Sequence, residues 1–121
     1  MKVLLVAVYP AVGAVLRHVL AGLIEELLEC AERGAAWELY AVHRPAYVLL
    51  DAALPGRAAL DLTRQFTEAD PTIRVLWLAD HDDGAWRQAA FAAGATGVVL
   101  KENLLAVREW LTASATKENV S

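Results

Sequence analysis

The sequence predicts a doubly wound α/β domain built on a parallel β-sheet. One observation is a series of short apolar runs that are continuous rather than alternating, as expected of strands covered on both faces. The other is that the segments between these runs show helical apolar spacing or helix start and stop signals. Five strands then alternate with five helices, a pattern that places a functional site at the carboxyl ends of the strands.

Four strands are predicted directly by apolar runs. The run YVLLD ends in one carboxylate, Asp51, and a lone acid at the end of an apolar strand is costly unless it has a partner or a function. The four runs are residues 3–8 (VLLVAV), 47–51 (YVLLD), 75–79 (VLWLA) and 97–100 (GVVL).

Four helices have recognisable signals at their ends. Pro10 suits the first turn of a helix at 11–21, and a Pro55-Gly56 turn precedes a helix at 57–68. An Ala-rich helix at 84–93 stops at Gly94. Asn103 is the expected N-cap of a last helix at 103–113.

Residues 22–34 allow two interpretations. Apolar periodicity alone would extend the first helix through GLIEELLECAERG. The strand–helix alternation instead requires a strand at 26–31 and a helix at about 35–43, with breaks at Gly22 and Gly34. We prefer the strand, because two consecutive helices would break the alternation of strands and helices along the chain.

Composition limits the classes of function. The 121 residues are enough for one domain, expected at 1–115, followed by a flexible polar tail at 116–121.

A net charge of -4 without any Lys/Arg cluster argues against a nucleic-acid surface. No apolar run approaches the roughly 18 residues of a membrane span. Cys30 is the only cysteine, which excludes an internal disulfide and fits a cytoplasmic location.

Three segments resemble bacterial response-regulator receiver domains, the CheY-like family. They are RPAYVLLDAALPGRAALDL, PTIRVLWLADHDD and AAFAAGATGVVLK, and the likeness runs from about Lys2 to Thr112. The resemblance implies two-component-type signal transduction and a flavodoxin-like sheet of order 2-1-3-4-5, with helices on both faces and residues 26–31 at one edge. The sequence of these segments is most similar to receivers that usually precede a helix-turn-helix DNA-binding domain. Its markers are Asp51, Pro55-Gly56, Ala93-Gly94-Ala95, Gly97 and Lys101.

The resemblance also assigns roles to individual positions. In that family the strand-end aspartate accepts a phosphoryl group and a lysine contacts it; these positions hold Asp51 and Lys101. The acidic pair that holds Mg²⁺ falls on Ala7 and Val8. The position of the Thr or Ser that binds the phosphoryl group holds Ala79. The position of the aromatic residue whose ring turns inward holds Val98. Three of the five features are therefore replaced.

These replacements predict an atypical receiver, a pseudo-receiver. Mg²⁺ needs oxygen ligands, which Ala7 and Val8 do not supply, so we expect no metal, no cofactor and no catalysis. Asp51 and Lys101 are then expected to form a structural ion pair, with Asp51 not phosphorylated and regulation exerted by protein–protein interaction. Two alternatives stay open: a working phosphoacceptor at Asp51, and a small-molecule sensor using the space vacated by the acidic pair, between the first and third strands.

Two further groups of residues are candidates. The acids Asp80, Asp82 and Asp83 are expected in a solvated loop and helix start, although Asp80 could lend a carboxylate to the site. Trp86 and Trp110 lie on the helices that flank the last strand. That face is expected to bind a protein partner or a second copy, unless each ring folds back on its own helix. No direct contact with nucleic acid or membrane is expected.

Overall fold

The computed structural model describes the backbone of residues 1–120 and the side chains of residues 1–113. The predicted tail at 116–121 lies outside the residues that are described in full. A five-stranded parallel sheet has the order β2-β1-β3-β4-β5, which confirms the predicted fold. Its strands are β1 (Lys2–Val6), β2 (Glu26–Cys30), β3 (Tyr47–Asp51), β4 (Arg74–Ala79) and β5 (Gly97–Leu100).

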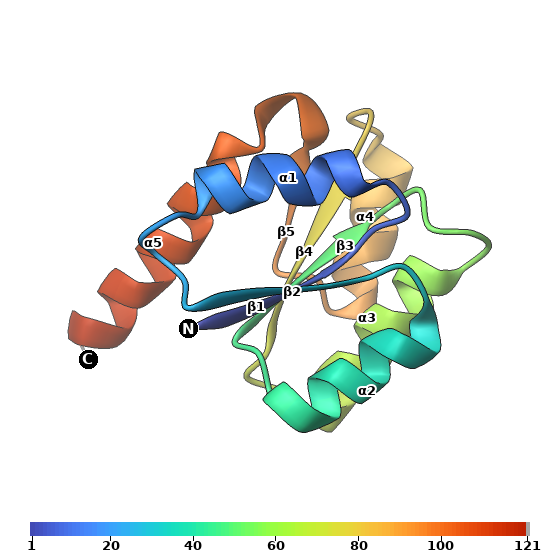
Figure 1. The fold of residues 1–121 in the computed structure, drawn as a ribbon. Coiled ribbons are helices and arrows are strands. Elements are labelled where there is room, and N and C mark those ends of the chain that lie inside the picture. The colour runs from blue at the N-terminus through green and yellow to red at the C-terminus, as the bar shows by residue number, and fades with distance from the viewer. Residues whose placement is uncertain (121) are drawn as a thin grey trace.

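Helices cover both faces of this sheet. Figure 1 shows α1 and α5 on one side and α2, α3 and α4 on the other. The helices are α1 (Pro10–Val19), α2 (Arg33–His43), α3 (Ala58–Ala69), α4 (Gly84–Ala93) and α5 (Leu105–Val120), with a 3₁₀ turn, η1 (Lys101–Asn103), before α5. None of the described helices is long and apolar enough to cross a membrane.

The strands divide their apolar side chains between two cores. All five residues of β3 are buried, as a strand covered on both faces requires. The α2, α3 and α4 core contains Val6, Val48, Leu50, Tyr40, Leu62, Phe66 and Trp77. The α1 and α5 core contains Leu5, Tyr47, Leu49, Leu16, Leu78, Val107 and Leu111.

The edge strand β2 confirms the second interpretation of residues 22–34. The break after α1 falls where Gly22 takes a positive φ of 80°, a conformation that glycine adopts at little cost. Glu29 of β2 then lies against Gly13 of α1, where a Cβ would collide with its carboxylate, and it pairs with Arg17. Gly13 thus leaves room beside α1 for the Glu29 carboxylate, the flexible end of its side chain.

Some predicted boundaries were wrong. The expected break at Gly34 is not there, because α2 begins at Arg33 and Gly34 lies inside it. The first strand ends at Val6 rather than at residue 8, because the chain turns there towards α1 and Val8 is exposed. Asn103 is not the N-cap of the last helix. It closes the η1 turn, and α5 begins only at Leu105.

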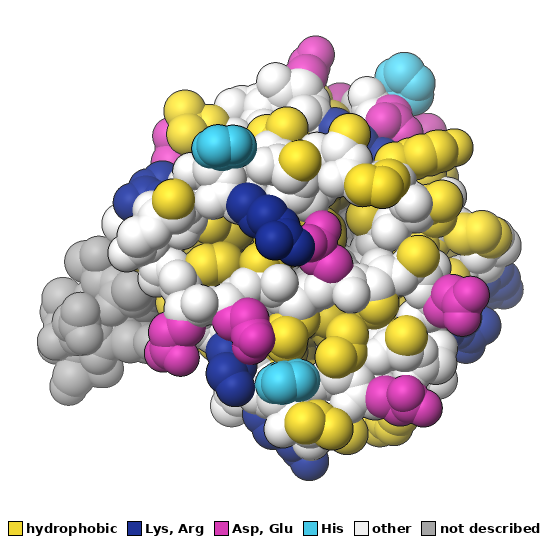
Figure 2. Space-filling view, viewed as in Figure 1, with side chains coloured by type: hydrophobic (Ala, Val, Ile, Leu, Met, Phe, Trp, Pro, Cys, Tyr) yellow, Lys and Arg dark blue, Asp and Glu magenta, His cyan; other side chains and the backbone are white. Residues whose placement is uncertain are grey.

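Charged side chains of both signs are spread over the surface. On the face shown in Figure 2, Lys and Arg side chains lie beside Asp and Glu side chains and do not form a single basic area. Described ion pairs such as Arg17–Glu29 and Arg33–Asp61 are part of this mixture. This face therefore lacks the basic stripe that marks a nucleic-acid surface.

Candidate functional site

Asp51 and Lys101 meet at the carboxyl edge of the sheet. Asp51 ends β3 and is only 1% exposed, whereas Lys101 opens the η1 turn directly after β5. The Lys101 Nζ lies 2.8 Å from Asp51 Oδ1, and the backbone N–H of Ala53 donates to the same oxygen at 2.8 Å. The predicted ion pair is therefore present, and it is a charge-assisted hydrogen bond of good length.

Asp80 is a second carboxylate beside Lys101. Its Oδ1 lies 3.4 Å from Lys101 Nζ, although the Asp80 side chain is 55% exposed. Burial by itself would lower the pKa of Lys101, but the hydrogen bond and charge of Asp51, followed by those of Asp80, outweigh it and raise the pKa. Lys101 thus stays a cation held between two acids.

The preferred interpretation of the acidic loop applies to two of its three acids. Asp83 accepts hydrogen bonds from the backbone of Ala85 and Trp86 and caps α4, and Asp82 pairs with Arg87. The solvated-loop interpretation does not describe Asp80 fully, because its carboxylate contacts Lys101 and therefore belongs to the site.

The second oxygen of Asp51 has no such partner. Among the described residues, no hydrogen-bond donor reaches Asp51 Oδ2, although this atom is buried. Buried polar atoms are normally hydrogen-bonded, so an unmatched one marks either a strained group or a group with a function.

The replaced positions carry apolar side chains. Ala7 and Val8 follow β1 and carry no side-chain oxygen. Ala79 ends β4 as a buried methyl group, and Val98 of β5 packs against the core on the α3 and α4 side. No hydroxyl or aromatic ring therefore stands at these two positions.

The residues present do not fit a Mg²⁺ ion. Such an ion takes an octahedron of oxygens and is commonly held by one or two carboxylates in addition to water. One Asp51 oxygen is committed to Lys101 and Ala53, and Asp80 also faces the lysine. Within the described part of the chain, no group of three His, Cys, Asp or Glu residues could hold a metal.

The two candidate interface tryptophans are placed differently. Trp110 is 36% exposed, and its ring lies over β5, where a Cβ on Gly97 would come within 2.6 Å of it. Trp86 is 44% exposed at the start of α4 and lines small hollows beside Trp77. Both rings are thus half-exposed on the helices that flank β5, and Trp110 rests on the strand itself.

Two contacts that tie elements of the fold together were not predicted. The indole N–H of Trp77 donates to Thr63 Oγ1 at 2.9 Å and ties β4 to α3 inside the core. The guanidinium of Arg108 donates to the carbonyls of Val19 and Ala21 and ties α5 to the end of α1. Neither pair has a spacing in sequence that would reveal it.

The sequence and the fold match a known family. A family model described as the response regulator receiver domain matches residues 3–109. The chain belongs to this family. It is a receiver domain of the kind found in two-component response regulators, which are signalling modules rather than typical enzymes.

Curated relatives are transcriptional regulators that are longer than this chain. The "Probable transcriptional regulatory protein NarL" of Mycobacterium tuberculosis is 31% identical over 91 residues, 75% of this chain and 42% of that protein. The "Transcriptional regulatory protein DegU" of Brevibacillus brevis is 33% identical over 67 residues, 55% of this chain and 28% of that protein. The chain spans less than half the length of these relatives.

Solved receiver structures agree. A two-component response regulator of the LuxR family from Aurantimonas superposes with a TM-score of 0.74 at 26% identity, covering 99% of this chain and 98% of the other. The RcsB response regulator of Salmonella typhimurium superposes with a TM-score of 0.82 at 18% identity, covering 97% and 62%. The second likeness is one of fold alone.

Proposed function

We propose that this receiver domain acts in two-component-type signalling through contact with another protein, without phosphorylation of Asp51 and without catalysis. The observation that carries the proposal is the arrangement around Lys101. Its ammonium is held by Asp51 at 2.8 Å and faces Asp80, while positions 7 and 8 supply no carboxylate. An internal cation thus compensates the buried Asp51 carboxylate and partly compensates Asp80.

Phosphoryl transfer to Asp51 lacks its main electrostatic support. Such transfer depends on positioning and on metal ions that neutralise the developing charge. Lys101 supplies one positive charge, but Ala7 and Val8 leave the site without the two carboxylates after β1 that would recruit a divalent ion. Attack by Asp51 on a phosphodonor is therefore expected to be slow.

The conformational switch of the family also lacks two of its side chains. A hydrogen bond to a charged group contributes roughly 1.5–3 kcal/mol, and Ala79 has no hydroxyl to make one. Moving a two-state equilibrium from 1:99 to 99:1 takes about 5.5 kcal/mol, so this loss removes a large share of the driving force. Val98 has no ring to turn inward, and Trp77 is already fixed to Thr63.

The surface of α4, β5 and α5 is our candidate for the partner or homodimer contact. Trp86 and Trp110 present half-exposed rings there, and large aromatic residues are the usual anchors of protein interfaces. The mixed surface charge and net charge of -4 favour a protein over nucleic acid. A cytoplasmic setting suits the single thiol of Cys30, whose pKa is raised by burial.

One observation favours a second candidate, a working phosphoacceptor. Asp51 Oδ2 is buried and has no donor among the described residues, so it is not committed to another contact. Incubation with acetyl phosphate and Mg²⁺, followed by intact-mass measurement, distinguishes the two functions. An unchanged mass supports the phosphorylation-independent receiver, and a phosphoryl group on Asp51 supports the alternative.

A further inference from the structure

An apolar cavity lies beside the candidate site but outside the contacts of Lys101. It has a volume of about 230 Å³ and opens between the carboxyl end of β1, the start of α2 and the loop from β3 to α3. Its apolar walls are formed by Val6, Ala31, Leu54, Pro55, Ala58 and Leu62. The replaced acidic-pair positions, Ala7 and Val8, do not line this cavity and instead border a separate hollow with Pro10 and Glu29.

Four of the six apolar wall residues belong to the core, whereas Ala31 and Pro55 are exposed. Val6, Leu54, Ala58 and Leu62 are buried, and all four belong to the core on the α2, α3 and α4 side. The short side chain of Ala58, at the first position of α3, leaves the space open. Core packing thus holds the inner walls of the hollow, and its outer side is open to solvent.

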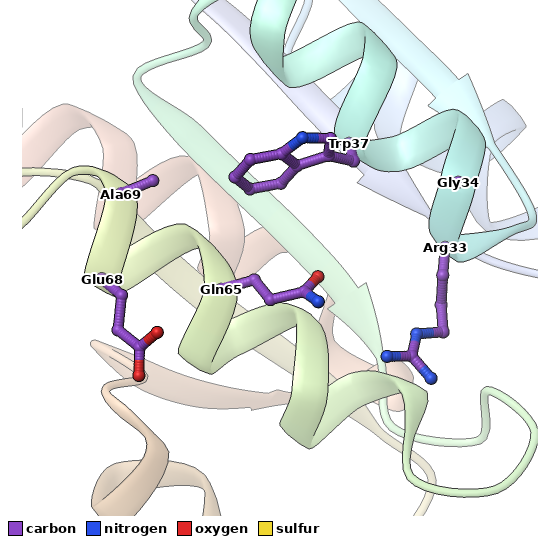
Figure 3. Close-up of a pocket in the computed structure, with 6 residues that line it drawn as sticks. All are labelled: Arg33, Gly34, Trp37, Gln65, Glu68 and Ala69. Carbon is purple, nitrogen blue, oxygen red and sulfur yellow. The ribbon is translucent and has the colours of Figure 1, made fainter.

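The rim carries two opposite charges. Glu32 and Arg33 line the mouth, and Arg33 pairs with Asp61 of α3 at 3.3 Å. Figure 3 shows Arg33 extending from the start of α2 towards α3. Because both partners of this pair are partly exposed, the pair is weak and can open without much loss of stability.

These features define a chemical class of ligand. An apolar cavity of about 150 Å³ can take up benzene, so 230 Å³ accommodates a ring with a short substituent. No buried polar side chain lines the cavity, and the cation on its rim, Arg33, is already paired with Asp61, so a charged ligand would lose hydration without gaining a free partner. We propose that this cavity binds an uncharged apolar molecule about the size of a substituted benzene.

A ligand there would touch the loop that holds Asp51. Leu54 and Pro55 line the cavity, and the Leu54 N–H donates to the Asp51 carbonyl at 3.1 Å. In the same loop, the Ala53 N–H donates to the Asp51 carboxylate. Occupancy is thus expected to restrain the loop next to the site. The inference rests on the cavity and not on whether Asp51 is phosphorylated.

A larger hollow on the same side of the molecule is the competing location. Figure 3 shows it between α2 and α3, with Trp37 and Gln65 facing it from opposite helices and Glu68 turned away from Trp37. Its volume is about 560 Å³, and its lining carries charges of both signs. A probe that bound there would perturb Trp37 rather than Leu54 and Leu62.

Methyl NMR with toluene as the probe tests the proposal. We expect saturable shift changes at the methyl groups of Val6, Leu54, Ala58 and Leu62, together with a rise in the melting temperature. Sodium benzoate should produce neither effect. Ala58→Leu fills the cavity and should weaken toluene binding by about tenfold or more. Ala92→Leu, at an exposed position of α4, should leave binding unchanged.

Ala31→Leu gives an independent test from the opposite wall and should weaken toluene binding in the same way, even if Ala58→Leu does not fold. The proposal is overturned if toluene shifts no methyl group of the cavity, or if its changes centre on Trp37. Equal binding by the parent and a folded cavity-filling variant overturns it too, as does binding of benzoate as strong as that of toluene.

Discussion

The ammonium of Lys101 lies 2.8 Å from a carboxylate oxygen of Asp51, a side chain that is almost completely buried. Because the two residues come from the ends of β3 and β5, this contact joins strands that are not neighbours in the sheet. Asp80, directly after the intervening β4, faces the same ammonium. The carboxyl edge of the sheet is thus organised around one cation.

Removing that cation should destabilise the fold. Lys101→Met leaves the Asp51 carboxylate buried with only the Ala53 N–H as a described donor, and we expect a loss of about 1–3 kcal/mol in the free energy of unfolding. Urea denaturation measures this loss. Arg64→Met, which removes an exposed cation from α3, is the control and should change stability by less than about 0.5 kcal/mol.

The double variant shows whether the two side chains interact. Asp51→Asn combined with Lys101→Met should cost less than the sum of the two single changes, because the second change removes a group that has already lost its partner. Additive costs would mean that the contact contributes nothing to stability.

The contribution of Lys101 should depend on pH at the alkaline end. Its pKa is raised in the folded protein above the ordinary value of about 10.4, so the folded state holds the proton more tightly than the unfolded state. The stabilisation is then fully present below about pH 10.4 and is lost as the pH rises through the folded pKa. Urea denaturation of the parent and Lys101→Met should show a constant difference from pH 7 to about pH 9.5, and a shrinking one above about pH 10.5. A difference that grows with alkalinity would contradict this.

Magnesium should not bind until carboxylates are restored. Tryptophan fluorescence of the parent is expected to stay unchanged at millimolar Mg²⁺, because one carboxylate paired with lysine attracts the ion weakly. The variant Ala7→Asp with Val8→Asp should give a saturable change, since Trp77 lies on β4 near the site. A submillimolar transition in the parent that vanished in Asp51→Asn would show that the acidic pair is not needed.

The proposed contact surface can be tested by sedimentation. Trp86→Ala and Trp110→Ala should each weaken self-association or partner binding, whereas Trp37→Ala, on α2, should not. Trp110→Ala also uncovers Gly97, so circular dichroism must show that the variant is folded. A parent that stays monomeric at high concentration would exclude the homodimer, and partner binding unaffected by both changes would exclude the surface.

Much of the fold could be predicted because local and global signals agree. Continuous apolar runs predicted four strands, and the alternation of strands and helices predicted β2 where periodicity favoured a helix. Boundaries were harder to predict. The apolar run at 3–8 continues past the end of β1, because Val8 is apolar but exposed, and exposure is set by tertiary structure.

The site was predictable in part. Asp51 and Lys101 were identified through the family resemblance. The family's known fold indicates which residues lie close together in space, and a single sequence does not. Asp80 was assigned to a solvated loop, because its closeness to Lys101 depends on strand register. Ala79 pairs with Leu100, so the residues that follow them, Asp80 and Lys101, become neighbours. Register between two parallel strands cannot be deduced from apolar runs alone.

The most direct test of the central claim is the intact mass of the protein after incubation with acetyl phosphate and Mg²⁺. Asp51→Asn is the negative control, and the variant Ala7→Asp, Val8→Asp and Ala79→Thr restores the acidic pair and the hydroxyl while leaving Val98 unchanged. We expect no added mass for the parent and one phosphoryl group on the restored variant. A phosphoryl group mapped to Asp51 in the parent would contradict the account and show that this receiver still works as a phosphoacceptor.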